Sequence, residues 1–305
     1  MEKTSKIAFA GCGVIGAGLA VNALLSGFPA ALYDTCEPEE IRKTVAHILD
    51  IFVENGAYTR QQADEAARRA TYTKNLAEAL EGAVFVQESI IERLEIKQAL
   101  YREIQTIAGE GIVIGSSASN LMTTQLQEGA LYPDRIVLGH PYNPSYLIPL
   151  VEIVKGEKTS RETVEFAKEV YTAMGKVAPV ALKETPSFIA QGLNGQLLLS
   201  AIQLVADGVA TAEDVDSALM YGPGMRLPIA GQLLSIGLGV KDGGWRTLAQ
   251  KYIGTSAPKE YLLVADQVDV EMAHRPPELG NDEESILKYR DKALIQMLRM
   301  QHRLS

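Results

Sequence analysis

Short apolar runs separated by helical stretches fill the first 180 or so residues of the chain. The apolar runs lie at residues 7–10, 30–33, 83–87, 112–114, 136–138, 150–154 and 177–181. Stretches with helical spacing lie between several of them, for example residues 92–108 and residues 160–174. This alternation is typical of a mainly parallel sheet that is covered by helices on both faces. The link between the last strands is short, which favours antiparallel pairing there.

A pair of helices interrupts the alternation after the second strand. Residues 38–55 carry apolar side chains at helical spacing, and Asn55-Gly56 ends that helix. Thr59 is typical of the N-cap of a following helix, which is rich in Ala, Arg and Glu. The charges of this helical hairpin favour a solvent-exposed face. The alternative is that the hairpin closes over a long, cofactor-like substrate.

After Lys183 the pattern changes to helices alone. An almost continuously apolar stretch at residues 187–205 predicts a helix that is buried in a helical core and contributes to a dimer interface. Thr211, followed by Glu213 and Asp214, indicates the start of another helix. We therefore expect one domain at residues 1–183 and an all-helical domain at residues 184–305.

A glycine-rich loop links the first apolar run to the first helix. Its candidate cofactor-binding residues are Gly11, Gly13, Val14, Ile15 and Gly16, which contain the pattern G-x-G-x-x-G. Such a loop lets the backbone approach a pyrophosphate at a helix N-terminus. Asp34, 18 residues past Gly16, is suited to accept hydrogen bonds from ribose hydroxyls and to repel a 2′-phosphate. We therefore predict NAD as the cofactor. The predicted fold is α/β: a Rossmann-type, mostly parallel sheet with an inserted helical hairpin, followed by an all-helical C-terminal domain.

The composition of the chain limits the kinds of molecule that this protein can bind. The 305 residues carry a net charge of −9, which argues against nucleic-acid binding and against anionic membrane surfaces. No apolar run approaches the roughly 20 residues of a spanning helix, and MEKTSK leaves no room for a signal peptide. Cys12 and Cys36 are the only cysteines, and no Cys or His cluster suggests a metal. We expect a cytoplasmic protein that acts on a small molecule.

Three polar residues could carry chemistry, and two of them follow strand ends, where open α/β sheets bind ligands. Ser119 lies in a serine-rich loop that could bind a substrate hydroxyl or merely cap a helix. His140 follows the strand at 136–138, and histidine suits general acid–base work. Glu152 lies inside an apolar strand, where an unpaired carboxylate is costly. It either faces solvent on an edge strand or pairs with an imidazole, whose tautomer it would then fix.

Seven stretches of the chain carry a family resemblance. They are AGCGVIGAGLA, LYDTCEP, NLAEALEGAVFVQESIIERLEIKQALYREI, GSSASNL, GHPYNPSYLIPLVEIV, LVADGVATAEDVDSALMYGPGMR and RDKALIQMLRMQHRL. Together they resemble the 3-hydroxyacyl-CoA dehydrogenase superfamily, and within it the branch of L-gulonate 3-dehydrogenase (lambda-crystallin) and L-carnitine dehydrogenase. The resemblance covers nearly the whole chain, and GHPYNPSYLIPLVEIV is its most specific part.

The resemblance implies a catalytic role for Ser119, His140 and Glu152. They match the family's serine, histidine and glutamate at spacings of 21 and 12 residues. One match fails: where the family has Asn-Arg in a motif like GFIxNRL, this chain has Gln191 and Gly192. Glutamine keeps the amide and changes its reach by roughly 1.5 Å. We keep Gln191 as a fourth catalytic candidate, and a shifted backbone, a different substrate or reduced activity remain the open consequences.

The resemblance also implies binding residues. Glu92 and Lys97 match residues that line the nicotinamide end of the cofactor site. Arg226 matches a position where a cation meets a substrate carboxylate. With Ser119 and Asn143, it completes the candidate substrate contacts.

Together these features predict an NAD-dependent oxidoreductase that interconverts a 3-hydroxy acid, or a 3-hydroxyacyl thioester, and its 3-keto form. A free acid is favoured over a CoA thioester, because Arg226 suits a carboxylate and the hairpin's basic residues are interspersed with acids. The alternative from another class is a cofactor-binding protein with little turnover. We expect a homodimer formed through the helical domain.

Overall fold

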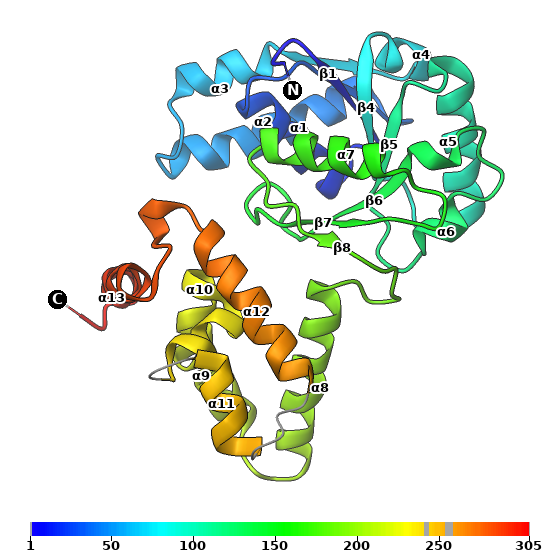
Figure 1. The fold of residues 1–305 in the computed structure, drawn as a ribbon. Coiled ribbons are helices and arrows are strands. Elements are labelled where there is room, and N and C mark those ends of the chain that lie inside the picture. The colour runs from blue at the N-terminus through cyan, green and yellow to red at the C-terminus, as the bar shows by residue number, and fades with distance from the viewer. Residues whose placement is uncertain (1, 241–243, 254–258, 305) are drawn as a thin grey trace. The chain divides into compact units, whose positions relative to one another are not determined.

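The chain consists of two compact units, Met1–Gly195 and Gln196–Ser305. The computed structural model describes residues 2–240, 244–253 and 259–304 (Figure 1). The division falls inside helix α8 (Ala190–Ala206), whose first turns belong to the first unit. The last strand of the sheet ends at Ala181, close to the change in composition at Lys183. The division between the two units comes later, after Gly195.

A single sheet forms the centre of the first unit. Its eight strands are β1 (Lys6–Ala10), β2 (Ala30–Tyr33), β3 (Ala70–Thr73), β4 (Ala83–Glu88), β5 (Val113–Ser116), β6 (Ile136–Pro141), β7 (Val151–Val154) and β8 (Val180–Ala181). Their spatial order is β3-β2-β1-β4-β5-β6-β7-β8. Neighbours are parallel except β6 and β7, which pair antiparallel. The predicted Rossmann-type sheet is confirmed, and the antiparallel pair occurs among the last strands.

Helices cover both faces of this sheet. They are α1 (Val14–Leu25), α2 (Pro38–Glu54), α3 (Arg60–Ala67), α4 (Leu76–Leu80), α5 (Leu94–Ala108), α6 (Thr123–Leu126) and α7 (Arg161–Ala173), with a 3-10 turn at Pro133–Arg135. Alternate residues of a strand enter different cores, since successive side chains point to opposite faces. Ile7 and Phe9 pack in one core with α1, α2 and α7, whereas Ala8 and Ala10 pack in the other with α4 and α5.

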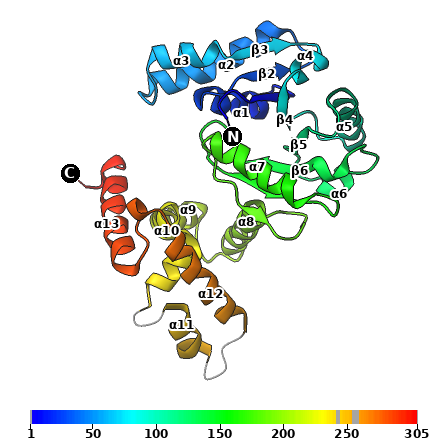
Figure 2. The same ribbon diagram turned by 45° about the horizontal axis from the view of Figure 1, so that its top comes forward.

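The inserted hairpin packs on the first helix. Helices α2 and α3 lie beside each other and beside α1 in both ribbon views (Figure 1, Figure 2). Thr59 caps α3, as expected: its side chain accepts from the Gln62 amide, and the Gln62 side chain accepts from the Thr59 amide. Exposed pairs such as Arg60 with Asp50 occupy the outer side, so the hairpin has a buried apolar face and a charged outer face.

The second unit is helical in its described residues. Besides the rest of α8 it contains α9 (Ala212–Tyr221), α10 (Pro223–Leu238), α11 (Gly244–Ile253), α12 (Lys259–His274), a 3-10 turn at Pro277–Leu279 and α13 (Glu283–Met300). Its small core includes Ile229, Leu234, Val268 and Ile286. Thr211 accepts a hydrogen bond from the Asp214 amide, which confirms the predicted N-cap of α9.

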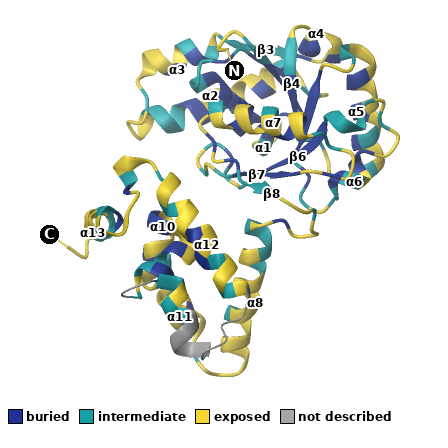
Figure 3. Cartoon of the chain, viewed as in Figure 1, coloured by how far each residue is buried: buried dark blue, intermediate teal, exposed yellow. Residues whose placement is uncertain are grey.

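Helix α8 differs from its prediction in two ways. It begins at Ala190 rather than at residue 187, because Phe188 has a left-handed φ of +49° and the amides of Ile189 and Ala190 bind Glu152. The expectation that it lies in a helical core is wrong for the single chain, since no residue of α8 is buried (Figure 3). Among the described helices, none is both long and apolar enough to cross a membrane.

Candidate active site

The glycine loop between β1 and α1 fits a dinucleotide phosphate. A side chain at Gly11 would lie 2.6 Å from the Ser89 carbonyl carbon, and one at Gly16 would lie 1.9 Å from the Gly11 carbonyl oxygen. These two glycines are therefore required by the packing of the chain itself. A side chain at Gly13 would meet no heavy atom within 4 Å. The space beside Gly13 is thus open to a ligand, as the approach of a pyrophosphate requires.

A cavity of about 550 Å³ adjoins this loop and has Asp34 in its wall. The Asp34 carboxylate is fixed, because Oδ2 accepts from the Cys12 amide at 2.6 Å and Oδ1 from the Thr35 amide at 2.6 Å. Val14, which starts α1, is exposed, and Ile15 is half-buried. The cavity and its carboxylate suit the adenosine half of NAD, whose ribose hydroxyls Asp34 can bind.

Antiparallel strands β6 and β7 bring His140 and Glu152 together as a cross-strand pair. Nδ1 of His140 lies 3.5 Å from Oε2 of Glu152, an ion-pair distance rather than a well-formed hydrogen bond. Glu152 is completely buried, and His140 is 8% exposed. The alternative of a solvent-facing Glu152 on an edge strand is therefore wrong.

The start of α8 holds the other oxygen of Glu152. Oε1 accepts from the Ile189 amide at 2.9 Å and from the Ala190 amide at 2.7 Å. Burial disfavours the charged form of this carboxyl, but the His140 imidazole and the two amides outweigh it and lower the pKa of Glu152. The carboxylate is thus ionised at neutral pH and stabilises a positive charge on the ring.

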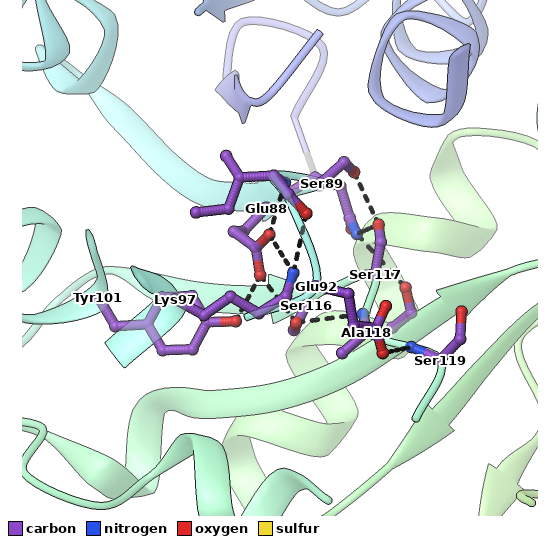
Figure 4. A network of polar contacts seen from close by, with 12 residues as sticks. Glu88, Ser89, Glu92, Lys97, Tyr101, Ser116, Ser117, Ala118 and Ser119 are labelled. Atoms are coloured by element: carbon purple, nitrogen blue, oxygen red, sulfur yellow. Dashed lines mark hydrogen bonds and ion pairs between the residues drawn. The ribbon is translucent and has the colours of Figure 1, made fainter. Parts of the chain in front are cut away.

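Ser119 completes a line of three side chains. Its Oγ lies 3.2 Å from Nε2 of His140, on the opposite side of the ring from Glu152. The backbone at Ser119 is held by Glu92, whose Oε1 accepts from the Ser119 amide at 2.7 Å and from the Asn120 amide at 2.5 Å (Figure 4). Phe188 packs on the imidazole with ring centroids 5.2 Å apart. A substrate hydroxyl near Nε2 would therefore meet both a base and a hydroxyl group.

Gln191 lies in the first turn of α8, directly after the amides that bind Glu152. Its Oε1 is buried and has no hydrogen-bond partner among the described residues. A side chain at Gly192 would meet only ordinary contacts, the nearest at 3.5 Å from the Ser187 carbonyl oxygen. The packing of the chain therefore does not require glycine at this position, and the amide of Gln191 can still take a partner.

The remaining candidates lie in different surroundings. Lys97 is 1% exposed, and its Nζ donates to Glu88 Oε1 and to the Ile90 carbonyl. Asn143 is exposed between β6 and β7, before a cis peptide bond to Pro144. Arg226 is an exposed residue of α10, in the second unit. In the part of the chain that the structure describes, no group of three or more His, Cys, Asp or Glu could hold a metal.

Two structural residues of the site escaped the sequence prediction. Ser145, in the loop between β6 and β7, is fully buried and donates to the Ile15 carbonyl, which ties that loop to α1. Gly18 leaves room for it, since a side chain there would lie 2.2 Å from Ser145 Oγ. Glu88 is the second, and it had a sequence signal: like Glu152, it is an acid in an apolar strand.

An open α/β sheet that carries a dinucleotide-binding loop and the aligned side chains of Ser119, His140 and Glu152 is typical of the class of NAD-binding oxidoreductases. Comparison with known proteins gives the family. Residues 6–185 match the model of the 3-hydroxyacyl-CoA dehydrogenase NAD binding domain, and residues 188–274 match that of the 3-hydroxyacyl-CoA dehydrogenase C-terminal domain. The chain belongs to the 3-hydroxyacyl-CoA dehydrogenase family, and its cofactor is NAD.

Individual relatives are similar over most of the chain. L-carnitine dehydrogenase of Pseudomonas putida is 37% identical over 85% of this chain and 80% of its own length. That of Streptomyces coelicolor is 33% identical over 99% and 96%, respectively. Among solved structures, 3-hydroxybutyryl-CoA dehydrogenase from Escherichia coli has a TM-score of 0.68 and 25% identity, covering 89% of this chain and 57% of the other. The similarity therefore extends to the helical unit.

Proposed function

We propose that this protein is an NAD-dependent dehydrogenase that interconverts a free 3-hydroxy acid and its 3-keto form. The observation that carries the proposal is the line of Ser119, His140 and Glu152, with distances of 3.2 Å and 3.5 Å on the two sides of the imidazole. A base whose far nitrogen faces a buried carboxylate is poised to take a proton from a hydroxyl group.

In the oxidative direction His140 Nε2 removes the proton of the substrate hydroxyl. Glu152 stabilises the imidazolium that forms, and Ser119 hydrogen-bonds the substrate oxygen. Gln191, with its unpartnered Oε1, orients a polar group of the substrate. Bound NAD supplies the acceptor for the carbinol hydride. Proton transfer of this kind contributes about 10²–10⁴-fold to the rate, and the remainder comes from positioning.

Three observations support a free acid rather than a CoA thioester as the substrate. The relatives named above that match at 33–37% identity are L-carnitine dehydrogenases. On the hairpin, Arg42 is paired with Glu39 and Arg60 with Asp50, which leaves less free positive charge for CoA phosphates. In the helical unit, Arg226 lines a small cavity of about 70 Å³ together with Arg290, whose guanidinium is paired with Asp291, so Arg226 is the cation that suits a carboxylate group there.

A substrate panel tests this proposal. The purified protein is first titrated with NADH by fluorescence, and turnover is then measured with L-carnitine, sugar acids, short 3-hydroxy acids and 3-hydroxyacyl-CoA thioesters. The proposal predicts that a free acid has the highest kcat/KM. A preference for the CoA thioester would reject the substrate class, and NADH binding without any turnover would favour a non-catalytic cofactor-binding role.

The exposed face of α8 supports the further proposal of a homodimer through the helical domain. Large apolar side chains along this helix are 45–69% exposed in the single chain: Leu193, Leu197, Leu198, Leu199 and Ile202. An apolar surface of this kind is typical of a protein interface. Sedimentation of wild type and of Leu198→Arg is the test. We expect a dimer that the substitution dissociates, and a monomeric wild type would contradict the proposal.

A further inference from the structure

A fully buried carboxylate lies at the end of β4, next to the serine loop but outside the proposed catalytic line. Glu88 Oε1 accepts from Lys97 Nζ at 2.6 Å and from the Ile90 amide at 2.7 Å. Its Oε2 accepts from the hydroxyls of Tyr101 at 2.5 Å and Ser116 at 2.8 Å. Figure 4 shows these side chains, from β4, α5 and β5, converging on the one carboxylate.

The charges of this cluster are balanced inside the protein. Glu88 is 0% and Lys97 1% exposed, so neither ion is hydrated, and their contact together with three further donors satisfies the carboxylate. Burial, and then the charge of Glu88, raise the pKa of Tyr101 well above its ordinary value. The phenol therefore keeps its proton and acts as a fixed donor to Glu88. Moving any one member out of such a network would leave a buried charge without its partner, which is costly. The side chains are therefore held in one arrangement.

The network extends to the backbone of the serine loop. The Ser117 amide donates to the Glu88 carbonyl at 2.8 Å, and the Ala118 amide donates to Ser116 Oγ at 3.3 Å. The next two amides, of Ser119 and Asn120, donate to Glu92, as described above. Four consecutive amides are thus held by groups that belong to β4, to the end of β5 or to the segment before α5. The loop is fixed before any substrate binds, and its amides are already used.

We propose that Glu88, held by Lys97 and Tyr101, is a positioning residue that fixes Ser119 opposite His140. The inference deepens the proposed function and rests on it for its kinetic consequence. Glu88 acts through the loop backbone: its carboxylate orients Ser116, whose Oγ accepts from the Ala118 amide, and its backbone carbonyl holds the Ser117 amide, so together they set the path of the chain into Ser119. A displacement of about 1 Å at a reacting group can cost on the order of 10²-fold in rate, so a rigid anchor of this loop matters for turnover.

Tyr101→Phe is the mildest test, because it removes one hydroxyl and leaves the ring in place. We expect kcat with the best substrate to fall about tenfold while the Kd for NADH stays within about twofold of wild type. Ser116→Ala, which removes both a donor to Glu88 and the acceptor of the Ala118 amide, should lower kcat further. In Glu88→Gln the NH₂ group of the new side chain must point at a donor, either Lys97 or the hydroxyls of Tyr101 and Ser116. We expect kcat of the folded variant to fall by about 10²-fold.

Gln105→Met on the same helix is the matched control. Gln105 is 1% exposed, and its side chain binds the backbone of Leu131 and Tyr132, in a loop that carries no site residue. This variant should lower the melting temperature without changing kcat. If Tyr101→Phe and Gln105→Met lower kcat equally, or if Tyr101→Phe leaves kcat unchanged, the positioning role is rejected.

Hydrogen exchange separates this inference from the proposed function. The amides of residues 117–120 should exchange faster in Tyr101→Phe than in wild type and remain protected in Gln105→Met, whether or not a substrate is turned over. A wild type without activity on the whole panel would reject the proposed function, and faster exchange would still support the anchor. Unchanged exchange at these amides in Tyr101→Phe would reject the anchor by itself.

Discussion

Replacing Glu152 by glutamine is the sharpest test of the proposal that a buried carboxylate supports His140 as the base. The substitution keeps the shape of the side chain and removes its charge. A glutamine oxygen can still accept from the amides of Ile189 and Ala190, which now bind Oε1 at 2.9 Å and 2.7 Å. The NH₂ group must then face His140 Nδ1, where Oε2 now lies at 3.5 Å.

This change reverses the preferred tautomer of the ring. A donor opposite Nδ1 favours a proton on Nε2, the nitrogen that lies 3.2 Å from Ser119 and must be free to take the substrate proton. The imidazolium also loses its buried counter-charge. We expect kcat to fall by about 10²–10⁴-fold, the full range for general base catalysis, which corresponds to about 3–5 kcal/mol of barrier.

The assay is NADH formation at saturating NAD, together with the Kd for NADH and the melting temperature. Glu184→Gln is the matched control, since that carboxylate also binds protein donors, the amide of Thr124 at 3.0 Å and its hydroxyl at 2.7 Å. It should leave kcat unchanged. If Glu152→Gln keeps wild-type kcat while it remains folded, the carboxylate does not assist the imidazole and the reasoning is refuted.

Two other predictions concern the cofactor loop and a buried lysine. Gly13→Ala should keep the melting temperature of wild type and weaken NADH binding. In Gly16→Ala the new side chain would lie 1.9 Å from a backbone oxygen, so this variant should lose at least about 1–3 kcal/mol of folding stability. Equal effects of the two substitutions on the melting temperature would contradict this prediction. Burial lowers the pKa of Lys176 from 10.5 to about 8. Between these pH values the unfolded chain holds the proton that the folded chain has lost, so stability relative to Lys176→Met should rise as the pH increases through this window. Urea unfolding at several pH values measures it, and a difference independent of pH would refute it.

Hydrophobic periodicity and turn residues were sufficient to predict most helices and strands of the first unit. The strand at residues 30–33, the cap at Thr59 and the antiparallel pairing near the end of the sheet are all local features, and the structure contains them. For Glu152 the sequence left two alternatives, a solvent-facing side chain or an imidazole partner, and only the structure excludes the first, because the residue is completely buried. The same reasoning indicates that Glu88 needs a buried partner, but the identity of its partners, Lys97 and Tyr101, requires the fold.

Features that depend on distant contacts could not be predicted. Helix α8 begins late because Phe188 adopts a left-handed conformation, which no local pattern indicates and which the binding of Glu152 to two amides accompanies. Its apolar residues suggested burial, yet burial depends on what the helix packs against, and within one chain nothing covers them among the described residues. The contact of Glu92 with the amides of Ser119 and Asn120 likewise requires the fold.

The central claim is that His140 is the base of an NAD-dependent dehydrogenase. Turnover of the preferred 3-hydroxy acid by His140→Gln, measured together with its NADH affinity, tests this most directly. We predict a kcat at least about 10²-fold below wild type with unchanged NADH binding. Wild-type turnover in the folded His140→Gln variant would contradict it.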